Sequence, residues 1–278
     1  MEEANVPPRK MLSATPQDRR VQVGGHTVDV RGTFAPERPA VVLVHGIGMS
    51  GEYFLPFAEV LAADFDVYAV DLPGYGSTPN PSRALTIPEL GEVVAGLCAA
   101  LGLQSPVLVG HSMGCQIVTH TLANHPRLSA GYVLIGPPAD PAARSFGGHA
   151  WRLFRDTLAE PFTTNAVVFR NYLRMGPLRY FRTARYMLAD RPEETILRCP
   201  VPGLIVRGRR DPIAAASWVR QLARLAPQAR VREVPGGPHA LQHHQPQALA
   251  KACAPFLTAV TRPGDGSTAS PPEKWPTP

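Results

Sequence analysis

Short runs of consecutive apolar residues constrain the fold of this chain more than any other feature. Val41–Val44, Val67–Val70 and Val107–Val109 are apolar at every position, without the polar alternation of a half-exposed strand. Such runs are typical of strands buried on both faces of a parallel sheet. Because parallel strands require long crossover connections, usually helices, we expect helical segments between these runs.

The rest of the chain continues the same rhythm of strand and helix. Val21–Val23 and Thr27–Val30, joined through Gly24-Gly25, predict an antiparallel hairpin at the sheet edge. Further strands are expected at Val133–Ile135, Gly203–Val206 and Val231–Val234, and helices at Pro56–Ala63, Glu89–Leu101, Met113–Asn124, Ala215–Leu225 and Gln247–Val260. The pattern predicts an α/β fold, with a mostly parallel eight-stranded sheet and helices on both faces.

The rhythm breaks once, between Gly136 and Cys199, where the sequence has helical patterning and no convincing strand. We interpret this stretch as an inserted helical cap. The two ends of the chain are polar and contain proline, so both are expected to be poorly ordered. The expected divisions are a flexible N-terminal segment at 1–20, a core formed by 21–136 and 199–260, a cap insertion at 137–198 and a disordered C-terminal tail at 261–278.

Composition argues against a nucleic-acid-binding protein, a membrane or secreted protein and a cysteine metal site. The formal charge of +6 comes mainly from dispersed arginines, and without a Lys/Arg run we expect no nucleic-acid partner. No apolar stretch is long enough for a signal sequence or a membrane span, so we expect a cytoplasmic protein without a membrane partner. The cysteines Cys98, Cys115, Cys199 and Cys253 form no Cys-x-x-Cys pair, which indicates reduced, buried thiols rather than a metal site.

Ser112 is the strongest candidate for a chemically active residue. It follows the apolar run that ends at Gly110 and precedes the amphipathic segment Met113–Asn124, so it lies at a strand-to-helix turn. A Gly-x-Ser-x-Gly sequence in this setting predicts a nucleophile elbow, in which Gly110 and Gly114 stand where a Cβ would clash. The amino end of the following helix then directs free N–H groups toward negative charge.

The segment His45-Gly46-Ile47-Gly48 follows the strand at Val41–Val44 and can face the elbow across the sheet. With HGIG, DLPGYG, GHSMG, GRRD and GGPH in this order, the chain resembles the α/β-hydrolase superfamily over about residues 20 to 260. The resemblance implies that the backbone N–H groups of Ile47 and Met113 bind an oxyanion. We expect His45 to pack and hydrogen-bond beneath this loop.

A serine hydroxyl needs a nearby base at neutral pH. His239, in the GGPH segment after the last strand, matches the position of the superfamily's catalytic histidine, although His244 and Pro246 depart from its usual downstream pattern. The resemblance places the acid that orients this histidine at Asp211, and Asp140 after an earlier strand is the alternative. Asp71, in DLPGYG, is expected to shape a turn.

These residues predict a serine hydrolase that cleaves a carboxylic ester or a related acyl bond through an acyl-enzyme on Ser112, without cofactor or metal. The aromatic residues concentrated in the cap insertion predict a small substrate with an apolar portion, although a helical insertion also needs a core of its own. The same residues could cleave a carbon–carbon, lactone, thioester or amide bond, or transfer an acyl group. A non-catalytic protein that binds a small ligand is the alternative from another class. Oligomeric state stays open.

Overall fold

A computed structural model describes residues 16–143, 175–226 and 228–262. Eight strands form one sheet in the order β1-β2-β4-β3-β5-β6-β7-β8, in which β2 pairs antiparallel with β1 and β4 and all other neighbours are parallel. The strands are β1 (Gln17–Val23), β2 (His26–Gly32), β3 (Ala40–Val44), β4 (Asp66–Asp71), β5 (Val107–His111), β6 (Gly131–Ile135), β7 (Gly203–Gly208) and β8 (Ala229–Val234). The predicted eight-stranded, mostly parallel sheet is confirmed.

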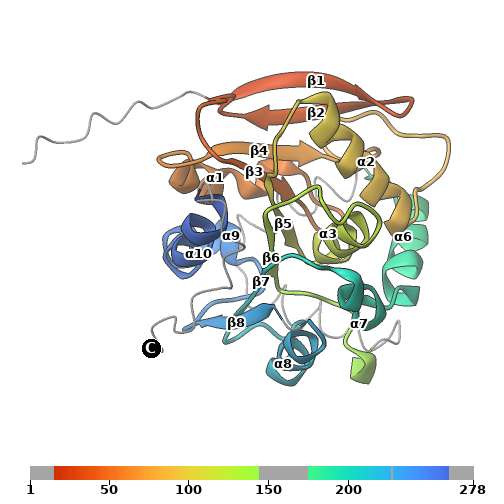
Figure 1. The fold of residues 1–278 in the computed structure, drawn as a ribbon. Helices are drawn as coiled ribbons and strands as arrows, with labels where there is room; N and C mark the ends of the chain where they lie inside the picture. The colour runs from red at the N-terminus through yellow and green to blue at the C-terminus, as the bar shows by residue number, and fades with distance from the viewer. Residues whose placement is uncertain (1–15, 144–174, 227, 263–278) are drawn as a thin grey trace, which may run out of the picture.

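Helices cover both faces of this sheet, as Figure 1 shows. One face is covered by α1 (Leu55–Leu61), α9 (Leu241–His244) and α10 (Pro246–Thr261), and the other by α2 (Ile87–Ala100), α3 (Met113–Asn124), α6 (Pro177–Ala189) and α8 (Ala216–Leu225). Shorter helices are η1 (Gly51–Phe54), η2 (Pro141–Ala143), α7 (Pro192–Thr195) and η3 (Ile196–Arg198). The five helices expected between strands are all present, with ends shifted by one or two residues or unchanged.

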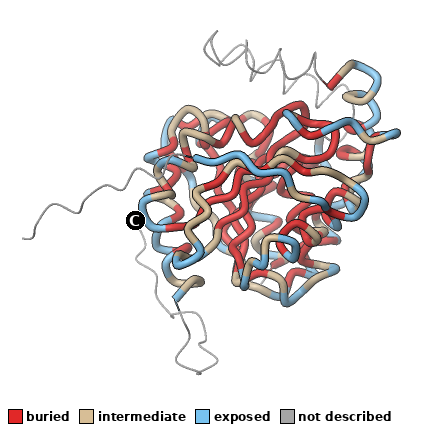
Figure 2. Tube along the Cα trace, turned by 90° about the horizontal axis from the view of Figure 1, so that it is seen from above, coloured by how far each residue is buried: buried red, intermediate tan, exposed pale blue. Residues whose placement is uncertain are grey.

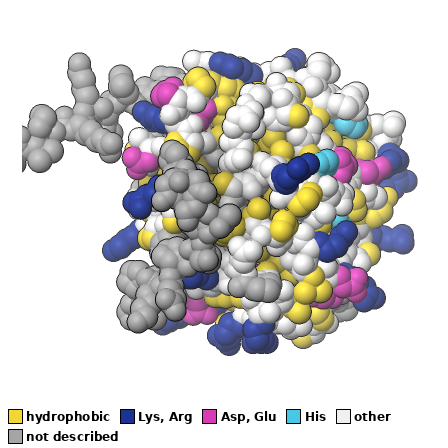
Figure 3. Space-filling model, in the orientation of Figure 1, with side chains coloured by type: hydrophobic (Ala, Val, Ile, Leu, Met, Phe, Trp, Pro, Cys, Tyr) yellow, Lys and Arg dark blue, Asp and Glu magenta, His cyan; other side chains and the backbone are white. Residues whose placement is uncertain are grey.

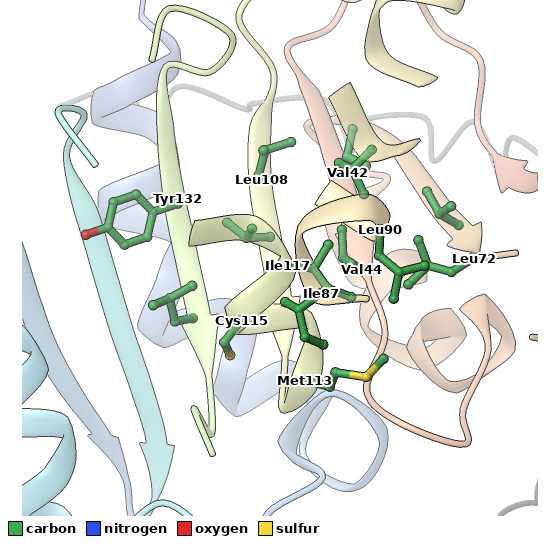
Figure 4. Close-up of a cluster of buried hydrophobic side chains, with 14 of the residues drawn as sticks. Val42, Val44, Leu72, Ile87, Leu90, Leu108, Met113, Cys115, Ile117 and Tyr132 are labelled. Atoms are coloured by element: carbon green, nitrogen blue, oxygen red, sulfur yellow. The ribbon is translucent and has the colours of Figure 1, made fainter. Parts of the chain in front are cut away.

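Alternate residues of the central strands enter two separate hydrophobic clusters. On β5, Val107 and Val109 pack in the cluster with α1 and α10, whereas Leu108 packs in the cluster with α2 and α3. Figure 4 shows Leu108 near Val42 and Ile117 in one buried cluster, and Figure 2 shows that buried residues gather in the interior of the molecule. Because both faces are covered by helices, apolar residues are favoured at every strand position, which explains the unbroken runs in the sequence.

The first strand begins earlier than the sequence indicated. Residues Gln17–Arg20, assigned to the flexible segment 1–20, pair with Asp29–Gly32 as part of β1, so that assignment is wrong for these four residues. They are exposed because β1 lies at the edge of the sheet, and therefore they show no apolar pattern. Ion pairs also link the two strands, with Arg20 Nε 2.8 Å from Asp29 Oδ1 and Arg31 Nε 2.6 Å from Asp18 Oδ1.

The expected cap insertion at 137–198 lies only partly within the described residues, since 144–174, with most of its aromatic side chains, fall outside them. In the described remainder the regular elements are helical. Helix α6 is attached to α3 by hydrogen bonds from Gln116 Nε2 to Met187 O at 2.8 Å and to Asp190 Oδ2 at 2.9 Å. Met175 and Met187 are buried in the main core, so these two apolar residues contribute to packing.

The surface carries mixed charge. On the face in Figure 3, Lys and Arg side chains are dispersed with Asp and Glu among them. Within the described ranges, no helix is both long and apolar enough to cross a bilayer. All four cysteines are buried and unpaired, as expected.

Candidate active site

The candidate residues meet at the carboxyl edge of the sheet. Ser112 directly follows β5, Asp211 follows β7 and His239 follows β8, and the loop at 45–48 follows β3. Since β3, β5, β6, β7 and β8 are parallel neighbours, their carboxyl ends lie along the same edge. This edge is where open α/β sheets place their ligands.

The backbone at Ser112 is held in a strained conformation. Its φ of 52° and ψ of −123° lie in a region that non-glycine residues rarely occupy, at a cost on the order of 1–3 kcal/mol. Hydrogen bonds hold the turn, from Ser112 N to Ile135 O at 2.9 Å and from Cys115 N to Ser112 O at 2.8 Å. The turn therefore presents the serine side chain beside the amino end of α3.

The two glycines of the motif permit this turn. A Cβ on Gly110 would lie 2.4 Å from Gly114 O, and a Cβ on Gly114 would lie 2.1 Å from Val44 O. Both distances are far inside van der Waals contact, and both opposing atoms belong to the backbone. Both glycines therefore stand where a Cβ would clash, as the motif predicted, and the elbow is packed directly against the end of β3.

His239 and Asp211 form a buried pair. The Nδ1 atom of His239 lies 2.8 Å from Asp211 Oδ2, and the two side chains are 7% and 0% exposed. Asp211 Oδ1 accepts hydrogen bonds from Ile213 N at 2.7 Å and Ala214 N at 3.0 Å. Burial opposes ionisation of Asp211, but the positive charge and hydrogen bond of His239 and the two amides together lower its pKa below the ordinary value. The carboxylate is therefore ionised at neutral pH and orients the imidazole.

Gly136 links the elbow to this pair, and sequence reasoning gave it no role. It directly follows Ile135, whose carbonyl accepts the Ser112 N–H, and a Cβ at Gly136 would lie 2.8 Å from His239 Nδ1 and 3.0 Å from Asp211 Oδ2. With a φ of 57°, it also adopts a backbone conformation that favours glycine. The end of β6 therefore lies between the nucleophile turn and the His–Asp pair, and brings them together.

The loop at 45–48 packs against the elbow. A Cβ built on Gly46 would lie 3.0 Å from Ser112 Cβ, so the loop backbone directly adjoins the serine. In the described part of the chain, neither Ile47 N nor Met113 N donates to another residue, and Met113 N is the first amide of α3. Ile47 N thus belongs to the loop that adjoins Ser112, and Met113 N directly follows Ser112 in the chain.

His45 has the structural role expected of it. Its Nδ1 lies 2.8 Å from Gly46 O and its Nε2 accepts a hydrogen bond from Leu72 N at 3.2 Å. Burial lowers the pKa of this imidazole, so it is neutral and carries its proton on Nδ1. This ring therefore fixes the base of the loop.

The other candidate carboxylates make local contacts. Asp140 Oδ1 accepts from Ala142 N at 3.0 Å, whereas the Nδ1 atom of His239 faces Asp211. Asp71 accepts from Gly51 N and Ser77 N, each at 2.7 Å, and so shapes the turn after β4 as expected. The geometry at His239 favours Asp211 over Asp140.

His111 is a further buried imidazole beside the pair. Its ring centre lies 4.7 Å from that of His239, and the residue is 4% exposed. Burial lowers the pKa of His111 well below the ordinary value, and a positive charge on His239 lowers it further when that ring is protonated, so the His111 ring is neutral. It occupies the variable second position of the motif, which explains why the motif did not indicate it.

Comparison with known proteins identifies the family of this chain. A model described as "Alpha/beta hydrolase family" matches residues 41–252. The chain belongs to the alpha/beta hydrolase family. It is similar to the pimeloyl-[acyl-carrier protein] methyl ester esterase of Xanthomonas campestris, with 30% identity over 250 residues that cover 80% of this chain and 96% of that protein.

Two further proteins are similar to this chain. The 2-(acetamidomethylene)succinate hydrolase of Mesorhizobium japonicum is 26% identical over 268 residues, which cover 87% of this chain and 95% of that protein. The crystal structure of a bacterial membrane phospholipase A shares the fold, with a TM-score of 0.79, 22% identity and coverage of 90% and 88%. As a member of the alpha/beta hydrolase family, the chain is a hydrolase, as the sequence predicted.

Substitution of Gly136 tests the close packing between β6 and the His–Asp pair. We expect Gly136→Ala to lower kcat by about 100-fold on an activated ester, because the new methyl group displaces His239 or Asp211. The control is Gly102→Ala, which imposes a similar backbone strain at a φ of 67° with no atom within 4 Å of the new Cβ. Equal kcat values for the two folded variants would contradict the packing described.

Proposed function

We propose that this hydrolase is a serine esterase in which Ser112, His239 and Asp211 act as nucleophile, base and orienting acid. The observation that carries the proposal is the strained Ser112 turn, joined through Gly136 to a buried His239–Asp211 pair. A base oriented by a buried carboxylate beside a sharply turned serine is the arrangement that serine acyl transfer requires.

The first step forms the acyl-enzyme. Ser112 Oγ attacks the ester carbonyl carbon while His239 Nε2 takes the hydroxyl proton. Asp211 stabilises the resulting imidazolium, and the N–H groups of Ile47 and Met113 stabilise the negative oxygen of the tetrahedral intermediate. His239 then gives its proton to the departing alkoxide, which leaves as an alcohol.

The second step releases the acid. His239 takes a proton from water, and the hydroxide attacks the acyl carbon of the ester on Ser112. The tetrahedral intermediate collapses, Ser112 Oγ regains a proton from His239, and a carboxylic acid leaves. Protons and oxygen atoms balance with water as the only co-reactant, so no cofactor or metal enters this route.

The proposed substrate is a small ester with an apolar portion. The esterase name of the Xanthomonas campestris relative supports the ester, and the aromatic content of the cap insertion supports the apolar portion. The unpaired state of the four cysteines supports a reducing compartment, so we propose that the protein acts in the cytoplasm.

Removal of the nucleophile tests this mechanism. Ser112→Ala should lower the turnover of a short p-nitrophenyl ester by about 10⁴-fold or more, because no acyl-enzyme can form. The matched control is Ser105→Ala, since Ser105 also has a positive φ, of 45°, but precedes β5 rather than following it. Retained turnover in Ser112→Ala, with unchanged circular dichroism, would refute the mechanism.

Two further measurements on the wild-type protein separate an esterase from enzymes that use the same three residues on another bond, and from a non-catalytic binding protein. Labelling by a fluorophosphonate that depends on Ser112 supports a reactive serine, whereas folded protein that resists the probe supports a ligand-binding role. Product analysis with matched ester, thioester, lactone, amide and carbon–carbon substrates then identifies the bond that is cleaved, and shows whether the acyl group passes to water or to another acceptor.

The identity of the acid is tested by paired substitutions. Asp211→Asn should lower kcat by about 10⁴-fold, because an amide does not stabilise the imidazolium and favours the wrong tautomer. Asp140→Asn, which keeps a group that can accept from Ala142 N, should leave kcat near the wild-type value. The reverse order of effects, measured by steady-state kinetics on the same ester, would assign the acid to Asp140.

A further inference from the structure

A buried arginine lies beside the loop that carries Asp211. Arg207 is on β7, four residues before Asp211, and is only 6% exposed. Arginine is almost never fully buried unless its charge is paired and its N–H groups are hydrogen-bonded. The mechanism proposed above does not use this side chain, so its burial requires another explanation.

The guanidinium group holds the acid loop, residues 209–214, at several backbone carbonyls. Arg207 Nε donates to Ala214 O at 2.7 Å, and Nη2 lies 3.3 Å from Asp211 O and 3.4 Å from Arg209 O. Its remaining nitrogen, Nη1, donates to Glu233 Oε1 at 2.9 Å. One planar side chain therefore connects the beginning, middle and end of the acid loop.

The acid loop in turn fixes the carboxylate of Asp211. Its Oδ1 accepts from Ile213 N and Ala214 N, which leaves Oδ2 facing His239. Ala214 is thus held on both sides, by Arg207 at its carbonyl and by the Asp211 carboxylate at its amide. A shift of the acid loop away from Arg207 would change the direction of Asp211 Oδ2 toward the imidazole.

Glu233 balances the buried charge and fixes the arginine. It is the β8 residue paired in register with Arg207, and its side chain is 30% exposed. Its second oxygen, Oε2, lies 3.8 Å from Arg209 Nε, at the start of the acid loop. The carboxylate therefore anchors both the arginine and the acid loop to the edge strand of the sheet.

We propose that Arg207 and Glu233 form a brace that positions Asp211 for catalysis, which makes Arg207 a positioning residue of the reaction. This inference rests on the proposed function, because the brace contributes to catalysis only if Asp211 orients His239. Lysine cannot replace the arginine, since one ammonium group cannot reach all the carbonyls that the planar fork contacts. The brace thus requires an arginine at position 207.

The test compares Arg207→Lys and Glu233→Gln with a control on an exposed ion pair. Arg191→Lys serves as the control, because Arg191 and Glu194 pair at 3.1 Å with side chains 63% and 64% exposed. We expect Arg207→Lys to lower kcat by about 10- to 100-fold with little change in KM, since a small displacement of a catalytic group has effects of this size. Glu233→Gln should act in the same direction with a smaller effect, and the control should match wild type.

The pKa of His239, followed by ¹⁵N NMR, separates positioning from general stability. A displaced Asp211 stabilises the imidazolium less, so the pKa of His239 should fall in Arg207→Lys and the acid limb of kcat/KM should move to lower pH. His111, an imidazole in contact with His239, is the same in every variant. This titration needs no turnover, so it tests the brace even if Ser112→Ala refutes the proposed mechanism.

Two results would overturn the brace. The first is that both Arg207→Lys and Glu233→Gln have the same kcat, and the same pKa of His239, as the control Arg191→Lys. The second is a loss of kcat that follows only the unfolded fraction, measured by circular dichroism, with an unchanged pKa of His239 in the folded protein. A fall in both kcat and the pKa of His239 in folded variants supports the brace.

Discussion

The close approach of backbone segments at the carboxyl edge of the sheet is the constraint on which the site depends. Gly114 adjoins the carbonyl of Val44, and a Cβ at Gly208 would lie 2.2 Å from Gly237 O. The first contact brings the Ser112 turn against the end of β3, and the second brings the His239 loop against the end of β7. Side chains at these glycines would separate the segments, so the spacing of the candidate residues follows from backbone packing.

The cost of burying charged groups at this edge is offset by their hydrogen-bond and ion-pair partners. A buried carboxylate without partners would cost several kcal/mol, but Asp211 has His239 and two amides as partners. Arg207, on the same strand, binds the backbone carbonyls of the acid loop and faces Glu233. Each charged group therefore has a partner: Glu233 on the edge strand pairs with Arg207, Arg207 holds the acid loop, and Asp211 in that loop faces His239. This chain of contacts favours one orientation of the imidazole.

The sequence was most informative where the residues that determine a structural feature are neighbours in the chain. Unbroken apolar runs predicted the central strands, and the turn chemistry of Gly-x-Ser-x-Gly predicted the conformation at Ser112. Gly136 and Arg207 could not be found in this way, because their partners His239, Asp211 and Glu233 become neighbours only in the folded sheet. The start of β1 was missed because an exposed edge strand needs no apolar pattern.

The central claim is that an acyl group is carried on Ser112 during turnover. Acid quench of the enzyme during steady-state hydrolysis of an activated ester, followed by proteolysis and mass spectrometry, measures this directly. We predict one acyl adduct on the peptide that contains Ser112, and its loss in Ser112→Ala. Rapid turnover with an adduct on a different residue that persists in Ser112→Ala would contradict it.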